Sequence, residues 1–399
     1  MEGIICTRGI TEDDSLKKFL NNSLKTLPDP ELMADMHRGV ARVYAAIQNG
    51  ENVLIYGDYD VDGITSTTLL VQFLRLFTDK IDYYIPDRHQ DGYGLNATVL
   101  SSRVKKYHLL IAVDCGTTSF EEIDTANQLG MDVIVIDHHK TESSLPEAVA
   151  VINPHREDCQ YPFNYMCAAG VAFMFIGALR KHMRQTGWFV NRTEPDIKIL
   201  LDLVAMATIA DMVPLKGLNR VLVVAGLRQM GYNFRPGLQA LIDDKSFNPK
   251  DIAVDDISFT IAPKLNAKGR LGDAAKAVEL LLATDYYKVK KMAADFTKAN
   301  KERQLLEQST VQHALTMVEE SGFHKNSAIV VYHEDWNPGV LGLVANRLLS
   351  RYRLPTVVFG KDGKGSARGL PPLDLYSVIN SCKQHLIQFG GHKNAAGMS

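Results

Sequence analysis

The chain has 399 residues, of which 46% are hydrophobic and 23% charged, and its formal net charge at pH 7 is −2. This length exceeds what one hydrophobic core usually supports, so we expect two domains. The composition excludes a disordered or low-complexity chain, and no apolar run reaches the roughly 20 residues of a membrane-spanning helix. The near-neutral charge argues against a protein that coats nucleic acid without specificity. We therefore expect a soluble globular protein without membrane attachment.

The charges are unevenly distributed. Residues 51–150 contain 7 Lys and Arg against 16 Asp and Glu, a balance of −9, whereas residues 351–393 contain 7 Lys and Arg against 2 Asp, a balance of +5. An acidic region can supply cation ligands, and a basic region can bind a polyanion. The alternative is that both are solvated surfaces of opposite sign.

The cysteines and the N-terminus bear on location. Five cysteines stand at positions 6, 115, 159, 167 and 382, without a Cys-x-x-Cys pair. This pattern favours reduced thiols over a disulfide framework or a structural zinc site. Residues 1–11 lack the basic and apolar regions of a secretory signal. We therefore predict a cytoplasmic protein.

Short apolar runs alternate with amphipathic stretches from about residue 50, which is typical of βα units that build a mostly parallel sheet. The predicted strands are Val53–Gly57, Ile81–Ile85, Leu109–Asp114 and Asp132–Ile136. The predicted helices are Ile64–Phe77, Asn96–Lys106, Phe120–Leu129, Ala168–Arg184 and Ile197–Ala210. Pro146, Pro154 and Pro162 predict an irregular stretch after the fourth strand.

The second half of the chain predicts a smaller α/β unit. An amphipathic segment at 285–320 predicts one long connecting helix. The segments that follow are Ala328–Tyr332, Val340–Ser350, Thr356–Phe359, Gly365–Gly369 and Leu375–Gln388. We therefore predict an α/β protein with four parts: a helical extension (1–50), a parallel-sheet domain flanked by helices (51–284), the long helix (285–320) and a smaller α/β domain (321–399). A cleft between the two α/β domains is the expected ligand site.

Three carboxylates, Asp58, Asp60 and Asp62, alternate directly after the first predicted strand and before a helix. Residues two apart in an extended chain face the same way, so we expect the three to project together at the carboxyl edge of the sheet. Like charges this close repel each other, and a bound cation relieves the repulsion. The alternative is an Asp-rich turn.

Two further strands also end in candidate ligands. Asp114 follows an apolar strand, although an Asp before a Gly often only shapes a turn. The next strand ends in Asp137, His138 and His139. Imidazole combined with carboxylate suits manganese, whereas magnesium usually prefers oxygen ligands alone. A lone His is more often a hydrogen-bonded bystander, but two adjacent ones beside several acids favour a metal site.

Asp211 closes a long apolar helix. The helix dipole makes an unpaired anion unfavourable at that end, and a nearby cation would remove the penalty. The alternative is a surface Asp that begins the turn before Pro214.

In this order, the four acidic segments resemble the motif set of the DHH phosphoesterase superfamily. They supply an Asp-x-Asp, a strand-end Asp, the Asp-His-His itself and a later Asp. Within that superfamily the chain is similar to RecJ-type nucleases over nearly its whole length, from Ile10 to Met398. The segments that carry this resemblance are Gly57–Ser66, Pro86–Leu95, Asp114–Ser119, Asn266–Asp273, Trp336–Val340 and Gly365–Arg368.

The resemblance implies a site for two divalent metal ions, Mn²⁺ or Mg²⁺. The metal ligands that it implies are Asp60, Asp62, Asp114, His138 and Asp211. Asp58 and His139 would complete the catalytic site together with Asp114, with His139 facing the scissile phosphate. The chain departs from many relatives at Tyr56, where they carry His, and this affects the expected coordination of one ion.

Gly-rich segments in the smaller domain predict contacts with an anion. Gly365–Gly369 offers backbone amides, a hydroxyl and a guanidinium, and Gly390-Gly391-His392 lets the main chain approach an anion before a helix-like stretch. A Gly-rich turn alone is more often only a turn. The substrate contacts that the resemblance implies are Asn266, Arg270, Ser366, Arg368, Gly390, Gly391 and His392. Relatives commonly carry Ala at Lys268 and Ser at Gly369, so one expected hydroxyl contact is missing here.

The resemblance implies a 5′-to-3′ exonuclease that acts on single-stranded DNA and releases 5′-mononucleotides in DNA repair and recombination. One alternative is a DHH-type phosphodiesterase acting on short oligoribonucleotides or cyclic dinucleotides, although those relatives tend to lack the 215–320 region. The other is a non-catalytic replication scaffold of the same fold. Such scaffolds lose ligand residues, whereas every expected acid and both histidines are present here.

RecJ-type proteins usually continue past the Gly-Gly-His segment with a helix and an OB-fold that holds single strands by stacking and charge. This chain stops at Ser399. We therefore expect an incomplete substrate-binding domain with a weaker hold on long DNA. The expected partners are the 5′ end of single-stranded DNA, a single-strand-binding protein and a helicase.

Overall fold

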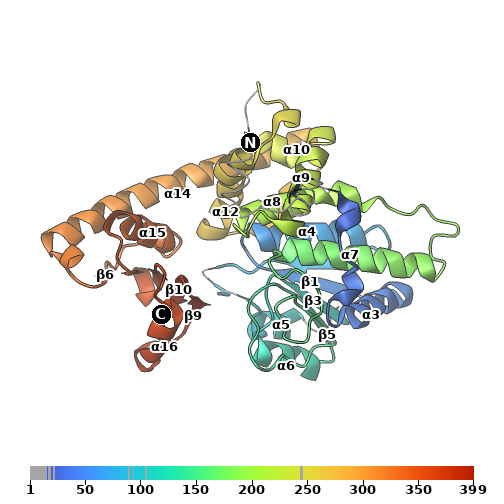
Figure 1. Cartoon of the computed structure of the whole chain (residues 1–399), viewed down its shortest axis with the longest axis horizontal. Coiled ribbons are helices and arrows are strands. Elements are labelled where there is room, and N and C mark those ends of the chain that lie inside the picture. The colour runs from blue at the N-terminus through green and yellow to red at the C-terminus, as the bar shows by residue number, and fades with distance from the viewer. Residues whose placement is uncertain are drawn as a thin grey trace. The chain divides into compact units, whose positions relative to one another are not determined.

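The computed structural model describes residues 16, 19–20, 23–88, 90–92, 94–103, 106–242 and 246–399. They belong to two compact units, Met1–Phe296 and Thr297–Ser399 (Figure 1). Most of residues 1–22 of the predicted helical extension lie outside the described residues, and the rest contains two 3-10 turns and α3 (Met36–Asn49). The predicted boundaries at residues 50, 284 and 320 stay predictions.

The first unit contains a five-stranded sheet in which every neighbouring pair is parallel. In spatial order the strands are β2 (Ile81–Tyr84), β1 (Val53–Gly57), β3 (Leu109–Val113), β4 (Asp132–Ile136) and β5 (Ala150–Ile152). The central strands β1 and β3 are buried along their whole length, because helices cover both faces. Continuous apolar runs are the sequence signature of such strands.

Alternation along β1 divides its side chains between two cores. Val53 and Ile55 face the core under α3, α4 (Val61–Leu74) and α7 (Ala168–Gln185). Leu54 and Tyr56 face the smaller core under α5 (Ala97–Arg103) and α6 (Phe120–Gln128). Figure 1 shows α5 and α6 on the side of the sheet away from α4 and α7.

A helical region follows α7 in the first unit. Its helices are α8 (Leu201–Ala210), α9 (Gly217–Tyr232), α10 (Pro236–Ile242), α11 (Val254–Asp256), α12 (Ala262–Leu271) and α13 (Ala275–Leu282). Their apolar faces join the core of α4 and α7. A buried ion pair between Asp202 of α8 and Arg235 at the start of α10 fixes this packing, and Arg235 also donates to the Leu281 carbonyl.

The second unit has a mixed five-stranded sheet. Its spatial order is β6 (Ile329–Tyr332), β7 (Thr356–Phe359), β8 (Gly365–Arg368), β10 (Ala395–Met398) and β9 (Phe389–His392). Only the β6–β7 pair is parallel. The end of α14 (Tyr286–Glu320) and α15 (Leu341–Tyr352) pack on one face, and α16 (Leu375–Ser381) packs on the other.

The α/β class, the parallel sheet, the long helix and the smaller α/β unit are confirmed, but several local predictions are wrong. The segment Leu375–Gln388 of the predicted smaller unit contains α16, which ends at Ser381, and Gly390-Gly391-His392 belongs to a β-hairpin instead of preceding a helix-like stretch. The three-residue strand β5 lies within the stretch predicted as irregular. The predicted helix Asn96–Lys106 includes residues 104 and 105, which lie outside the described residues.

Across the described part of the chain, no helix combines the length and apolar character that crossing a membrane requires.

Candidate metal centre and active site

The carboxyl ends of β1, β3 and β4 meet at one edge of the parallel sheet. Asp58 follows β1, Asp114 follows β3 and the segment 137–139 follows β4, while Asp211 comes from the end of α8. Their potential ligand atoms form three groups, each within 4.8 Å. The groups are Asp58, Asp60 and Asp114; Asp62, His138 and Asp211; and Asp114, His138 and His139. The structure thus brings together every predicted ligand and both remaining predicted catalytic residues.

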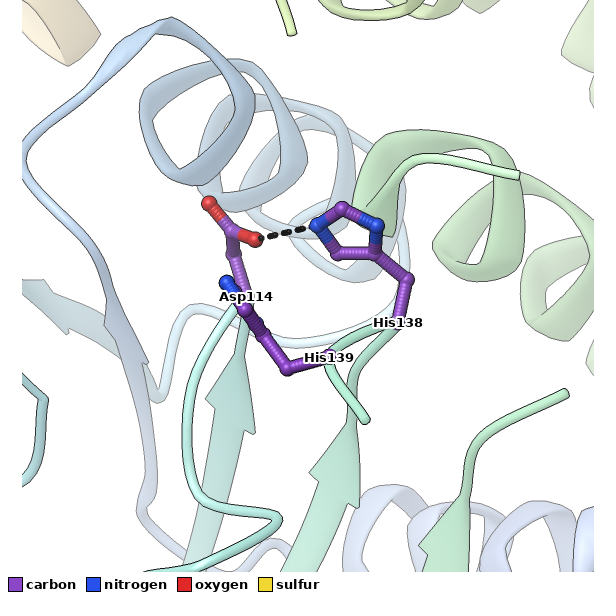
Figure 2. A group of neighbouring side chains, drawn as sticks. All are labelled: Asp114, His138 and His139. Carbon is purple, nitrogen blue, oxygen red and sulfur yellow. Dashed lines mark ion pairs between the residues drawn. The ribbon is translucent and has the colours of Figure 1, made fainter. Parts of the chain in front are cut away.

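The His138 imidazole lies at the centre of the cluster. Its Nε2 atom is 3.2 Å from an Asp114 carboxylate oxygen, 3.6 Å from Asp62 and 3.8 Å from Asp211. Figure 2 marks the pair of His138 and Asp114 with a dashed line. Asp114 reaches this position with a left-handed backbone, φ 61°, which Asp tolerates better than most residues. One nitrogen surrounded by three carboxylates is a geometry that a shared cation would satisfy.

The start of α4 explains why Asp60 and Asp62 face different groups. Asp60 caps the helix by accepting from the Asp62 and Gly63 amides at 2.9 and 3.2 Å. The helix therefore begins at Val61, three residues earlier than predicted, and Asp62 lies in its first turn. The three acids converge as expected, but a helix start, not extended alternation, directs them.

Asp62 is held from a distant part of the chain. Its two carboxylate oxygens accept hydrogen bonds from the Ala168 and Ala169 amides, at 2.7 and 2.8 Å. These are the first two amides of α7, where the positive end of the helix dipole favours an anion. The remaining lone pairs of Asp62 stay available to a cation.

Asp137 belongs to the Asp-His-His motif, but it is not among the metal ligands or catalytic residues that the resemblance implies. Its buried carboxylate accepts from the backbone amides of Thr117, His138 and His139, at 3.1, 2.7 and 3.2 Å. It also lies 2.7 Å from His139 Nδ1, which fixes the His139 ring. Asn153 donates to the His139 carbonyl at 2.8 Å and supports the same turn. Asp137 therefore organises the site without joining the three groups.

Charge and burial shift the pKa values of this pair in opposite directions. Burial lowers the pKa of His139, but the Asp137 carboxylate outweighs it and raises that pKa to about 9. Burial alone would raise the pKa of Asp137, yet His139 and the hydrogen bonds hold it well below its usual range. The raised pKa favours the protonated, positively charged form of His139 beside the cluster of acids.

Several carboxyls of the acid cluster have raised pKa values, unlike Asp137. Burial, and then neighbouring carboxylates, raise the pKa of Asp114 and of Asp211, the latter to about 8. Burial and Asp60 likewise raise the pKa of Asp58 well above its usual range. In addition, Asp58 Oδ1 is buried and has no hydrogen-bond partner among the described residues. The donor set and this orphaned oxygen fit divalent cations, which would favour the charged forms.

Two residues beside the cluster had no assigned role. The Arg88 guanidinium lies 5.3 Å from the centre of the Tyr59 ring. Tyr59 is the residue between Asp58 and Asp60. On the other side, Gly269 of α12 packs so closely that a Cβ there would lie 2.4 Å from the Tyr59 carbonyl oxygen. The Pro-Asp-Arg motif was the available sequence signal for Arg88. Arg88 adds a positive charge close enough to Asp58 to offset part of the rise in the pKa of that carboxyl.

Tyr56 does not take the place of the histidine found in relatives. Its fully buried ring belongs to the core under α5 and α6, and its hydroxyl donates to the Gly94 carbonyl at 3.0 Å. The strand alternation places it on the side opposite Ile55. The ligand set of this chain therefore has no contribution from position 56.

The predicted substrate contacts occur in both units. Asn266 and Arg270 lie one turn apart on α12 in the first unit. In the second unit, Ser366 and Arg368 lie on β8, where the Arg368 guanidinium packs against Gly342 in the first turn of α15. Gly390 and Gly391 lie on β9 and pair with β10. The main chain of His392 is also in β9, but its side chain lies outside the described residues.

Comparisons with known proteins agree with this arrangement. Residues 52–208 match the DHH family N-terminal domain, and residues 325–399 match the DHHA1 domain. The single-stranded-DNA-specific exonuclease RecJ of Bacillus subtilis is 37% identical over 99% of this chain and 49% of its own length. RecJ of Dickeya dadantii is 35% identical over 98% of this chain and 70% of its own length.

Solved structures give the same result. RecJ of Thermus thermophilus in complex with Mn²⁺ superposes with a TM-score of 0.84 and 30% identity, covering 99% of this chain and 55% of that one. The chain thus spans about half the length of the Bacillus and Thermus relatives. The two domain matches and the extended similarity show that the chain belongs to the RecJ family of the DHH phosphoesterases.

Proposed function

We propose that this chain is the catalytic core of a metal-dependent exonuclease that hydrolyses single-stranded DNA from 5′ to 3′ and releases 5′-mononucleotides. The observation that carries the proposal is the convergence of buried acids and His138 at one sheet edge. Relatives named single-stranded-DNA-specific exonucleases support the substrate class. A role in DNA repair and recombination in the cytoplasm follows from the same similarity.

The proposed cofactors are two divalent ions, Mn²⁺ or Mg²⁺. The residues that would hold them are Asp60, Asp62, Asp114, His138 and Asp211. When bound, such ions polarise phosphate oxygens and lower the pKa of water. Asp114 and His138 each belong to two of the three groups, and of these two only the Asp114 carboxylate offers two oxygen ligands, so Asp114 would be able to contribute to both ions. Asp58 belongs to one group, with Asp60 and Asp114. Mixed imidazole and carboxylate ligands favour Mn²⁺.

The protein's own residues supply positioning and charge. The Nδ1–H group of His139 donates to the Asp137 carboxylate, so a proton on Nε2 would be available to donate to a phosphate oxygen. The positive charge of protonated His139 would stabilise the negative charge that develops during hydrolysis. Arg88 would add a second positive charge near Tyr59.

We further propose that both units contribute substrate contacts. Asn266 and Arg270 offer an amide and a guanidinium from one face of α12. The predicted contacts in the second unit are Ser366, Arg368, Gly390, Gly391 and His392. A hydroxyl and a guanidinium at the first turn of α15 make an anion site, since that helix end favours negative charge. A single-strand-binding protein and a helicase are the proposed protein partners that would supply a free 5′ end.

The test is digestion of a single strand of several tens of nucleotides, labelled at one end or the other, with and without Mn²⁺. We expect the 5′ label to be released first, only with the metal, and Asp114→Ala to abolish release. Asp79→Ala is the matched control, because Asp79 is an exposed acid before the amino end of β2. Cleavage restricted to di- and trinucleotides or cyclic dinucleotides would replace this substrate class. If the protein binds the metal but cleaves none of these substrates, the proposal that it is an enzyme is refuted.

A further inference from the structure

The loop between β2 and α5 is closed by one carboxylate. Asp91 Oδ2 accepts a hydrogen bond from the Tyr84 hydroxyl at 2.6 Å and another from the Asp87 amide at 2.8 Å. The Asp91 amide donates in return to the Asp87 carbonyl at 2.8 Å. Asp87 and Asp91 are therefore hydrogen-bonded to each other, and Asp91 is also hydrogen-bonded to Tyr84, the last residue of β2.

The same loop is fixed at its far end. The Tyr56 hydroxyl donates to the Gly94 carbonyl at 3.0 Å, and Asn96 donates from its side chain to the Asp91 carbonyl at 2.9 Å. The rings of Tyr56 and Tyr84, on neighbouring strands, pack with their centres 5.3 Å apart. Two phenols from the sheet thus hold a loop whose own sequence is rich in Gly and polar residues.

The tied turn carries Arg88. Arg88 is the residue after Asp87, and its guanidinium lies 5.3 Å from the centre of the Tyr59 ring, beside the acid cluster. A long side chain on an untied turn would spend little time in one position, because ordering it costs rotamer and backbone entropy. The hydrogen bonds of Asp91 order the backbone next to Arg88 before a substrate binds, so less entropy is lost on binding.

We propose that Tyr84 and Asp91 are positioning residues for this active site: they fix Asp87, the residue before Arg88, and thereby hold the Arg88 guanidinium beside Tyr59. The inference rests on the proposed function for its substrate, an anionic single strand. It assigns a task to a phenol and a carboxylate that do not themselves reach the reacting atoms. Their effect on substrate binding passes through Arg88.

The test compares Tyr84→Phe with Tyr83→Phe. The first removes the hydroxyl that holds Asp91 and keeps the ring that packs on Tyr56. The second removes a hydroxyl from the adjacent residue of β2, whose side chain belongs to the core on the other face of the sheet. Thermal unfolding of both variants checks that the fold is kept.

We expect Tyr84→Phe to raise KM for a 5′-phosphorylated single strand about fivefold, the effect of one hydrogen bond, with kcat within about twofold. Tyr83→Phe should match the wild type. A double-mutant cycle gives the decisive result: in an Arg88→Gln background, Tyr84→Phe should cause no further rise in KM. Equal KM values for the two Phe variants, or independent multiplication with Arg88→Gln, would overturn the proposal.

Binding in the presence of a chelator separates this inference from the proposed function. Arg88→Gln should lower the slope of log affinity against log salt by about 0.7, the value for one phosphate contact on a single strand. Tyr84→Phe should weaken wild-type binding but not that of Arg88→Gln. If the wild type binds with this pattern and does not hydrolyse DNA, the proposed function fails and the positioning role stands. If it hydrolyses DNA and the pattern is missing, the positioning role fails.

Discussion

Replacing Asp137 by Asn tests the electrostatic organisation of the site. The substitution keeps the shape and one acceptor oxygen, but it removes the charge that faces His139 Nδ1 at 2.7 Å. The Asn NH₂ group would face either the Thr117 amide or the three donors around Oδ1. The first orientation loses the fewest hydrogen bonds, so we expect Thr117 N–H to lose its partner.

The magnitude follows from the raised pKa of His139. Burial lowers this pKa, whereas Asp137 and, to a smaller extent, Asp60 and Asp211 raise it, with a net change from 6.5 to about 9. A shift of this size stabilises the folded protein by about 3 kcal/mol. Because the folded pKa is the higher one, this stabilisation is complete below about pH 6.5 and is lost as the pH rises through 9. The unpaired Thr117 amide adds a loss of about 1–3 kcal/mol that does not depend on pH.

Urea denaturation of the chelated protein at pH 6 and pH 10 measures both contributions. We expect Asp137→Asn to lose about 3 kcal/mol more at pH 6 than at pH 10. Titrating groups that do not interact with Asp137 are shared with the wild type and cancel in the difference. Asp137 also raises the pKa of Asp114, so the comparison with Asp137→Asn reports the coupling of Asp137 to the whole cluster, with His139 as its direct partner. Asp79→Asn, at an exposed site, should show no such dependence. An equal loss for Asp137→Asn at the two pH values would refute the proposed coupling between Asp137 and His139.

Three further predictions concern the metal, the core and the start of α4. Mn²⁺ at about 100 times its Kd should stabilise the chelated wild type by about 2.7 kcal/mol in thermal unfolding and leave Asp114→Ala unchanged; equal stabilisation would exclude Asp114 as a ligand. Asp202→Ala should cost about 3–5 kcal/mol in urea, because Arg235 loses its buried carboxylate, and a loss below about 1 kcal/mol would contradict this. Gly63→Ala should remove most Mn²⁺-dependent activity, since a Cβ would lie 2.5 Å from the Asp58 backbone; full activity would show that this contact relaxes harmlessly.

The sheet and the acid cluster could be predicted because both depend on a simple rule. Buried parallel strands are uninterrupted apolar runs, and β1 and β4 have the predicted bounds. The carboxyl ends of such strands share one edge, so Asp58, Asp114 and His138 had to lie near one another. The position of Asp211 at a helix end predicted a nearby cation, but only the family resemblance assigned it to the same site, because no local pattern places the end of α8 at that edge.

The rest depends on contacts that the sequence does not reveal. The orientation of Asp62 is set by two amides more than a hundred residues away. The β9–β10 hairpin has too many glycines to show the alternation of apolar and polar residues that predicts a strand. Its backbone hydrogen bonds, between β9 and β10 and between β10 and β8, hold it in the sheet. The role proposed for Asp91 could not be predicted, because β2 has a tyrosine on each face, Tyr83 and Tyr84. The sequence does not show that Tyr84 is the one that donates to Asp91.

The bond between Asp62 and the start of α7 means that the site is not modular. A fragment ending before Cys167 would contain the Asp-x-Asp and Asp-His-His motifs, yet it would lack the two amides that orient Asp62 and the Asp211 carboxylate. Transplanting the motif-bearing βα units into another protein would therefore transfer the signature without its cation affinity. The shortest fragment that contains the complete set of candidate ligands extends at least to Asp211, at the end of α8.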